Sequence, residues 1–179
     1  MELLPLDDPK RYEIIHGELY VSKAPSTQHQ IVCSRVHVPL DLWDRATGLG
    51  VVIPGPGLIF AEDEDVIPDL VWVSKERLAL ILAPDGKLHA APELIVEVLS
   101  PGAANERRDR EAKLDLYSHQ GVREYWIPDW EHRLVYVYRR VGLALEFVAT
   151  LLDADTLDSP LLPGFALPVH ELFAELPVA

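Results

Sequence analysis

A near-continuous apolar run with one acid in its middle occupies residues 93–99, which read ELIVEVL. The run is short and rich in β-branched residues, and it is bounded by Pro92 and by Ser-Pro-Gly at 100–102. These features are typical of a strand that is buried on both faces of a sheet. An ionised carboxylate at Glu97 is costly to bury there unless it is paired, protonated or bound to a metal ion.

A strongly charged helix is predicted after this strand, over roughly 106–120. Asp109, Lys113 and Tyr117 recur in it at every fourth position. Residues four apart share one face of a helix. This helix can therefore present a carboxylate, an ammonium and a phenol to whatever lies beside it.

The N-terminal pattern predicts a β-hairpin followed by a long helix. Segments 12–15 and 18–21 flank a His-Gly pair in which the glycine supplies the turn. Apolar residues then recur at helical spacing from a cap at Ser26 or Thr27 to a stop at Gly48. Pro39 lies inside this helix and is expected to kink or split it.

Further apolar segments predict a mixed α/β order. Strands are expected at 51–53, 58–60, 68–73, 124–127, 133–138 and 145–148, a helix at 74–82, and a solvated acidic turn at 62–65. The proline-containing tail at 157–173 is expected to wrap the core before a short terminal helix. We expect a single domain over 1–179, with its core at about 12–140 and a C-terminal wrap at 141–179.

The composition is that of a folded globular protein, because 179 residues with 49% hydrophobic content suffice for a core without disulfides. The single cysteine, Cys33, excludes an internal disulfide framework, and we expect it to be a half-buried helix residue and not a zinc ligand. The sequence has no apolar run long enough to cross a bilayer and no secretory signal, which predicts a cytoplasmic protein.

The formal net charge of −13 argues against a chain that coats nucleic acid non-specifically, because phosphate contacts need Lys and Arg. A nuclease remains compatible with this charge, since cations mask its acidic site and its basic residues can be local. Candidates for local contacts are the clusters at 107–110 and 139–140, although either can equally be a solvated face.

Two acids stand where their surroundings disfavour them: Asp69, after Pro68 at the mouth of a predicted strand, and Glu97. If their strands are neighbours, the carboxylates meet and repel unless a cation lies between them or they share a proton. Carboxylates with a backbone carbonyl suit Mg²⁺ or Mn²⁺. A lysine on the next helix can stabilise phosphate charge or orient a water. This set of groups predicts phosphodiester hydrolysis.

Structural roles remain open for the same residues. Glu97 can be a core acid paired with Arg or Lys, and Asp69 can accept backbone hydrogen bonds at a strand end. Lys113 can be a solvated lysine paired with Asp109 four residues earlier, which leaves Asp109 as a helix partner or a neighbour of the site.

Several segments in this order resemble a large bacterial family of restriction-endonuclease-like proteins. The family was long catalogued as a domain of unknown function and is placed in the PD-(D/E)XK nuclease superfamily. The segments are YEIIHGEL at 12–19, His29, Pro68-Asp69, Glu97 in ELIVEVLSP, Lys113, Tyr117 and GVREYW at 121–126. The resemblance covers most of the chain, from about 12 to 138.

The resemblance implies a restriction-endonuclease-like fold, with a central mixed sheet flanked by helices and the predicted N-terminal hairpin. Asp69 and Glu97 match the two acids of the superfamily motif. Leu99 stands where that motif has lysine, and Lys113 on the helix is its stand-in.

The resulting hypothesis is a metal-dependent DNA endonuclease that works as a homodimer. Asp69, Glu97 and the carbonyl of Val98 are expected to hold Mg²⁺ or Mn²⁺, while Lys113 positions the attacking water. The second-tier candidates for the same site are Glu18, His29, Asp109 and Tyr117.

Two other hypotheses stay open: a catalytically inactive nuclease-fold protein that binds nucleic acid or a partner protein, and hydrolysis of another phosphodiester. The sequence contains no P-loop, GxGxxG or GxSxG motif, so no nucleotide cofactor is expected.

Overall fold

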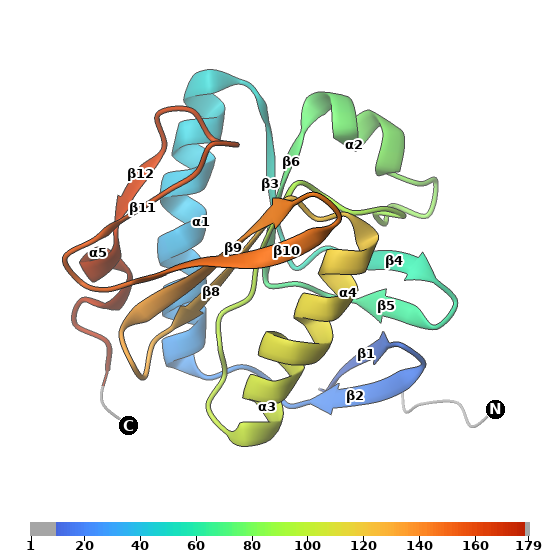
Figure 1. The fold of residues 1–179 in the computed structure, drawn as a ribbon, viewed down its shortest axis with the longest axis horizontal. Coiled ribbons are helices and arrows are strands. Elements are labelled where there is room, and N and C mark those ends of the chain that lie inside the picture. Colours follow the sequence, from blue (N-terminus) through green and yellow to red (C-terminus); the bar gives the residue numbers. More distant parts are fainter. Residues whose placement is uncertain (1–9, 178–179) are drawn as a thin grey trace.

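The structure of the protein is a computed structural model that describes residues 10–177. A six-stranded mixed sheet forms its centre (Figure 1), in the order β10-β9-β8-β7-β6-β3. The strands are β3 (Gly50–Pro54), β6 (Leu70–Ser74), β7 (Leu94–Val96), β8 (Glu124–Asp129), β9 (Leu134–Val141) and β10 (Ala144–Leu151). The β7–β8 pair is parallel, and the other pairs of this sheet are antiparallel. This architecture confirms the predicted fold class.

A second, four-stranded sheet in the order β2-β1-β5-β4 lies beside the first. Its strands are β1 (Arg11–Ile15), β2 (Glu18–Ser22), β4 (Leu58–Ala61) and β5 (Glu64–Val66). The predicted N-terminal hairpin is confirmed, with left-handed backbone at His16 and Gly17 in the turn. The prediction of an acidic turn throughout 62–65 is wrong, because Glu64 and Asp65 belong to β5, which ends at the fully buried Val66.

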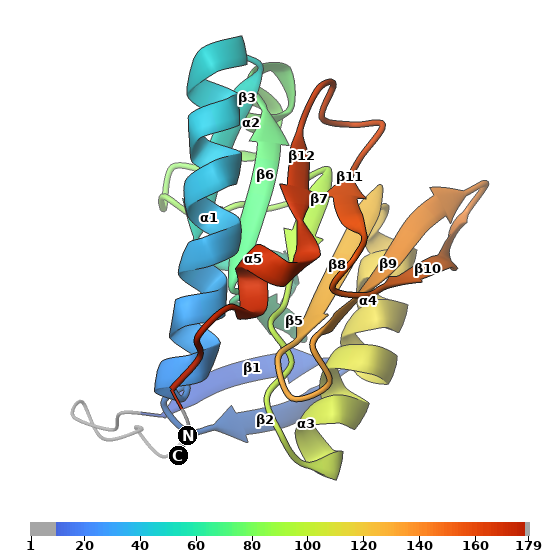
Figure 2. The same ribbon diagram turned by 90° about the vertical axis from the view of Figure 1, so that its left-hand side faces the viewer.

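Helices cover both faces of the central sheet, with α1 on one side and α4 on the other (Figure 2). The helical segments are α1 (Thr27–Thr47), α2 (Lys75–Ile81), α3 (Ala103–Arg107), the π-helical η1 (Arg108–Ala112), α4 (Lys113–Gln120) and α5 (Val169–Phe173). The segments α3, η1 and α4 follow one another without a break, so the predicted charged helix is confirmed, although its π-helical turn was not foreseen.

The ends predicted for α1 are confirmed. The Ser26 hydroxyl accepts a hydrogen bond from the amide of His29, and Gly48 ends the helix in the left-handed conformation. The helix is not split at Pro39. The fully buried Val36 and Leu40 on either side of the proline anchor the helix to the sheet, and this packing offsets the one hydrogen bond that proline cannot donate.

Alternation along the central strands decides which residues face which helix. Leu94, Val96 and Val98 belong to the core cluster beneath α1, whereas Ile95 and Leu99 belong to the cluster beneath α4. Successive side chains of a strand point to opposite faces. Glu97 therefore points toward α4, among the apolar side chains of that cluster.

The tail packs against the α1 side of the sheet. It contains the strands β11 (Thr156–Asp158) and β12 (Ala166–Pro168), which pair with each other, and the terminal helix α5. The two strands were not predicted, because three residues each are too short to show a period. None of the helices in the described part of the chain is long and apolar enough to cross a membrane.

Candidate active site

The register of β6 and β7 sets the two candidate acids opposite each other. Leu70 pairs with Val96 and Val71 pairs with Ile95 in an antiparallel ladder. One further step along that register places Asp69 opposite Glu97. Directly opposite residues point to the same face, with Cβ atoms about 4.5–5.5 Å apart.

Both acids line one cavity of about 440 Å³ at this end of the sheet. Basic and polar side chains share the cavity wall with them, among them Arg11, Lys23, His29, Asn105 and Arg108. The candidate site is thus a polar hollow in which two carboxylates are surrounded by hydrogen-bond donors and cations.

Asp69 is held by three elements, and its side chain is 6% exposed. Its Oδ2 accepts hydrogen bonds from the amide of Val98 at 2.9 Å and from Nε2 of His29 at 3.0 Å, and Arg11 Nη1 lies 3.3 Å from its Oδ1. Burial alone would raise the pKa of Asp69, but the His29 hydrogen bond and the charges of Lys113 and Arg11 lower it to about 2. Asp69 is therefore a carboxylate across the neutral range.

The backbone around Val98 supports its predicted place in the site. The amides of Glu97 and Leu99 donate to the carbonyls of Trp126 and Pro128, so pairing with β8 continues past the end of β7. The amide of Val98 points the other way, toward Asp69. In an extended strand the N–H and C=O of one residue point to the same side, so the Val98 carbonyl is directed toward the Asp69 side of the strand.

Glu97 is bound by α4, which packs on the face of the sheet toward which this side chain points. Its Oε1 lies 2.9 Å from Nζ of Lys113 and accepts a 2.7 Å hydrogen bond from the Tyr117 hydroxyl. Burial raises the pKa of Glu97. Lys113 lowers it, but Asp69 and Glu13 raise it further, so that it reaches about 7. This carboxyl group is thus poised between its neutral and charged forms near neutral pH.

Lys113 has a second carboxylate partner that the sequence analysis missed. Its Nζ lies 2.9 Å from Oε1 of Glu13 in β1, and both side chains are at most 2% exposed. Burial would lower the pKa of Lys113, but Glu97 and Glu13 together raise it, so the ammonium stays charged. The signal was present in the sequence: Glu13 alternates with the apolar Ile15, which places it on the buried face of the hairpin.

Glu13 also fixes the segment that precedes Asp69. Its Oε1 accepts a 3.0 Å hydrogen bond from the amide of Ile67. Burial would raise the pKa of Glu13, but Lys113 and this amide lower it. The buried acid of the hairpin therefore bridges Lys113 on α4 and the backbone two residues before Asp69.

The π-helical turn η1 orients Asp109 and Arg108. The amide of Lys113 bonds to the carbonyl of Arg108 five residues back, and the hydroxyl of Tyr125 donates to the carbonyl of Asp109 at 2.9 Å. The Arg108 guanidinium binds both carboxylate oxygens of Asp109, at 2.8 and 3.1 Å. Asp109 thus pairs with Arg108 and not with Lys113, so the i, i+4 pair considered from the sequence is replaced by this arrangement.

Of the less certain candidates, Glu18 lies apart from the others. It is exposed on β2, accepts a hydrogen bond from Tyr20, and lines a separate surface hollow. His29 and Tyr117 each bond directly to one of the two central carboxylates. The structure therefore groups these two residues with the site and separates Glu18 from it.

The charges of the cluster favour an added cation. Its charged side chains are the carboxylates of Glu13, Asp69, Glu97 and Asp109 and the cations of Arg11, Arg108 and Lys113. With all of them ionised, these residues carry one excess negative charge. Burial is the main cause of the raised pKa of Glu97, and the neighbouring acids Asp69, Glu13 and Asp109 add to it. Hard carboxylate and carbonyl oxygens suit Mg²⁺ or Mn²⁺, so the residues fit such an ion.

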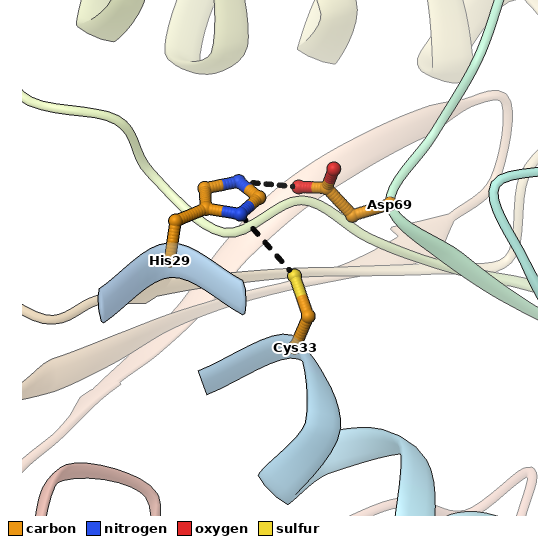
Figure 3. Close-up of side chains that lie close together, drawn as sticks. All are labelled: His29, Cys33 and Asp69. Carbon is orange, nitrogen blue, oxygen red and sulfur yellow. Dashed lines mark hydrogen bonds and ion pairs between the residues drawn. The ribbon is translucent and has the colours of Figure 1, made fainter. Parts of the chain in front are cut away.

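One end of α1 adds a different kind of ligand beside Asp69 (Figure 3). The Sγ of Cys33 lies 3.5 Å from Nδ1 of His29, whose Nε2 contacts Asp69. Burial raises the pKa of the Cys33 thiol, and the nearby Asp69 and Glu97 raise it further. The thiol is therefore neutral in the absence of a metal ion.

Comparison with known proteins gives a family and a fold. The family model Uma2, described as putative restriction endonuclease, matches residues 1–170. Among solved structures, the chain is similar to a putative nuclease belonging to DUF820 from Anabaena variabilis. The TM-score is 0.74 and the identity 18%, over 95% of this chain and 93% of that chain. At this identity the likeness shows the fold alone. No protein among those with curated functions matches the sequence.

The raised pKa of Glu97 predicts a pH-dependent stability difference between the metal-free wild type and Glu97→Gln. Below about pH 4.5 the carboxyl group is neutral in both the folded and the unfolded chain. Between about pH 4.5 and 7 the Glu97 carboxyl group is ionised in the unfolded chain and still protonated in the folded chain. Rising pH therefore lowers the unfolding free energy of the wild type by up to about 1.4 kcal/mol per pH unit. Above pH 7 the difference becomes constant.

Urea unfolding of both proteins in a chelating buffer at several pH values measures this difference. Glu18→Gln, which alters an exposed acid outside the cluster, should follow the wild type at every pH. Parallel curves for the wild type and Glu97→Gln from pH 4.5 to 7 would show that the Glu97 pKa is not raised.

Proposed function

This chain belongs to the Uma2 family, described as putative restriction endonucleases, and from that premise we propose that it is a divalent-metal-dependent endonuclease that hydrolyses phosphodiester bonds in DNA. One observation carries the proposal. Asp69 and Glu97 stand opposite each other at the ends of adjacent strands and line one cavity. The buried ammonium of Lys113 contacts Glu97 from the α4 side. Two carboxylates and an amine are the groups that metal-assisted phosphodiester hydrolysis requires.

Asp69, Glu97 and the Val98 carbonyl would hold Mg²⁺ or Mn²⁺. When bound, the ion would polarise a phosphate oxygen and lower the pKa of a water molecule. The three donors come from two neighbouring strand ends, which makes their spacing a property of the sheet. His29 and the Val98 amide keep the Asp69 carboxylate oriented, and Tyr117 does the same for Glu97.

Lys113 would act mainly through Glu97. Its ammonium lies 2.9 Å from Oε1 of Glu97 and is 1% exposed, so it favours the charged form of the acid that the ion needs. The ammonium also places a positive charge on the α4 side of the site. This charge stabilises the negative charge that develops on the phosphate during hydrolysis. We propose this electrostatic role together with the orientation of the attacking water.

The basic side chains of the cavity would bind the DNA backbone. Arg11, Lys23 and Arg108 line the hollow that contains the two acids. Phosphate binding needs such cations locally, even in a chain whose net charge is −13. Arg108 suits this role because Asp109 holds its guanidinium in one orientation.

We expect the purified protein to nick or cut DNA in the presence of Mg²⁺ or Mn²⁺ and to be inactive in a chelating buffer. Asp69→Asn and Glu97→Gln each remove a charged ligand with little change of shape, and each should lower the cleavage rate at least about 100-fold. Conversion of supercoiled plasmid to nicked and linear forms measures the rate.

Glu18→Gln is the matched control, since it neutralises an acid of the N-terminal hairpin that lies outside the cavity, and it should cleave at the wild-type rate. Equal cleavage by the wild type and both site variants would contradict the proposal. DNA binding without cleavage under all metal conditions would favour an inactive binding protein. Cleavage of a small phosphodiester but not of DNA would point to another substrate.

Lys113→Met tests the buried ammonium. The variant leaves Glu13 and Glu97 buried without their shared counter-charge, so we expect it to lose about 3–5 kcal/mol of unfolding free energy and most of its cleavage activity. Urea unfolding and plasmid cleavage are the measurements.

The exposed Lys75→Met serves as the control and should be nearly neutral in both assays. Adding Glu97→Gln to Lys113→Met should restore part of the lost stability, because one uncompensated charge is removed. Strict additivity of the two changes would argue that the two side chains do not interact.

Cutting both strands of a duplex needs two sites related by its dyad, so we expect a homodimer that acts on DNA. We also propose that the protein works in the cytoplasm. Light scattering coupled to size-exclusion chromatography, with and without a DNA duplex, measures the oligomeric state. A monomer under both conditions that still makes double-strand breaks would contradict this expectation.

A further inference from the structure

The face of α1 that meets Asp69 carries two metal-binding side chains that the proposed nuclease chemistry does not use as ligands. His29 and Cys33 are four residues apart, so they share one side of the helix. With Asp69 they form a cluster in which one ligand atom of each residue lies within 4.8 Å of the others. Figure 3 shows all three side chains converging from α1 and from the start of β6.

The three side chains lie close enough together to share one ion, although the two shortest distances run to different ring nitrogens of His29. Nε2 of His29 lies 3.0 Å from Oδ2 of Asp69, and Sγ of Cys33 lies 3.5 Å from Nδ1 of His29. Bonds of about 2.0–2.3 Å to nitrogen, oxygen and sulfur place neighbouring donors of a tetrahedral zinc ion roughly 3.3–3.7 Å apart. One ligand atom of each residue lies within 4.8 Å of the others, so the donors have to approach one another by up to about 1 Å to bind a single ion through one nitrogen of His29.

The chemistry of the three donors selects a different ion from the proposed nuclease site. One imidazole, one thiolate and one carboxylate suit Zn²⁺, whereas Mg²⁺ prefers oxygen ligands alone. Cys33 supplies the selectivity, since the carboxylate of Asp69 is common to both sites.

A metal ion can reach the cluster through a second hollow, separate from the cavity that Asp69 and Glu97 line. Cys33 and Asp69 line this hollow of about 350 Å³, which Arg11 also lines together with His37. An ion can reach the cluster from this side, and a water molecule can take the fourth position of the ion.

We propose that His29, Cys33 and Asp69 form an inhibitory site for a thiophilic divalent cation, with zinc as the ion whose coordination chemistry fits best. Binding joins the ion to one imidazole nitrogen, the Cys33 sulfur and an Asp69 oxygen, and the thiol proton passes to solvent. No electron is transferred. The ion withdraws Asp69 from the ligand set that it shares with Glu97. The regulatory consequence rests on the proposed function, whereas binding of the ion does not.

This inference revises the expectation that a single cysteine excludes a zinc site. That expectation rested on the presence of one cysteine alone. Here the cysteine is joined by a histidine from the same helix and by an acid from a distant strand. Only the fold brings Asp69 to the side of α1.

Titration of the metal-free protein with Co²⁺, a spectroscopic substitute for zinc, tests the site without any enzymatic assay. We expect a near-ultraviolet charge-transfer band from the cobalt–thiolate bond, together with visible bands of tetrahedral intensity. Cys33→Ser should lose the charge-transfer band and bind zinc at least about tenfold more weakly. His37→Asn, which alters a histidine of the same hollow outside the cluster, should keep both. Absence of the band in the wild type, or its persistence in Cys33→Ser, would overturn the proposal.

Competition between ions tests the inhibition. Electron paramagnetic resonance of Mn²⁺ reports the occupancy of the nuclease site, and zinc should weaken Mn²⁺ binding in the wild type but much less in Cys33→Ser. Zinc should likewise inhibit plasmid cleavage by the wild type at concentrations at which Cys33→Ser keeps its own zinc-free rate. Equal effects of zinc on both proteins would overturn the inhibitory role. A cobalt–thiolate band and zinc–manganese competition in a protein that never cleaves DNA would refute the proposed nuclease function and leave the zinc site standing.

Discussion

The ammonium of Lys113 is buried between two carboxylates, and three parts of the fold have to be in place before that burial is tolerable. Glu97 comes from the central sheet, Glu13 from the N-terminal hairpin, and Lys113 from the start of α4. A lone buried charge costs several kcal/mol, so none of the three side chains is stable in its place without the others. This interaction therefore ties the second sheet and the helix to the one end of the central sheet where Asp69 also lies.

The same interaction explains how four carboxylates can lie close together in the folded protein. Lys113 and the two arginines nearby leave one excess negative charge among the four carboxylates. Burial raises the pKa of Glu97, and the neighbouring carboxylates raise it further. A cation that enters the cavity favours the ionised form of the Glu97 carboxyl group. Burial, which makes the carboxylate costly in the free protein, thus also makes the site selective for a positively charged occupant.

Much of this arrangement could be predicted from the sequence, because local signals specify it. The caps at Ser26 and Gly48 predicted the ends of α1, and the position of Glu97 inside the apolar run 93–99 marked this acid as unusual. Glu13 was missed as a site residue because an acid is ordinary in a short hairpin. Its alternation with Ile15 indicates a buried face, but its contact with Lys113 follows only from the packing of the hairpin on α4. The π-helical turn was missed for a related reason. Its wide geometry is stabilised by the hydroxyl of Tyr125, which is adjacent only in the folded chain.

The position of the lysine follows from what the strand can accommodate. In the superfamily motif the lysine would stand at Leu99, on the same face as Glu97 and two residues further along the strand. In this chain Leu99 is 5% exposed and belongs to the apolar cluster beneath α4, so an ammonium there would meet hydrocarbon. A lysine that arrives from α4 approaches Glu97 from the helix side instead, where the hairpin supplies Glu13 as a second acid. The hairpin thus belongs to the same cluster, because the buried ammonium of Lys113 contacts two carboxylates and the central sheet provides only one of them.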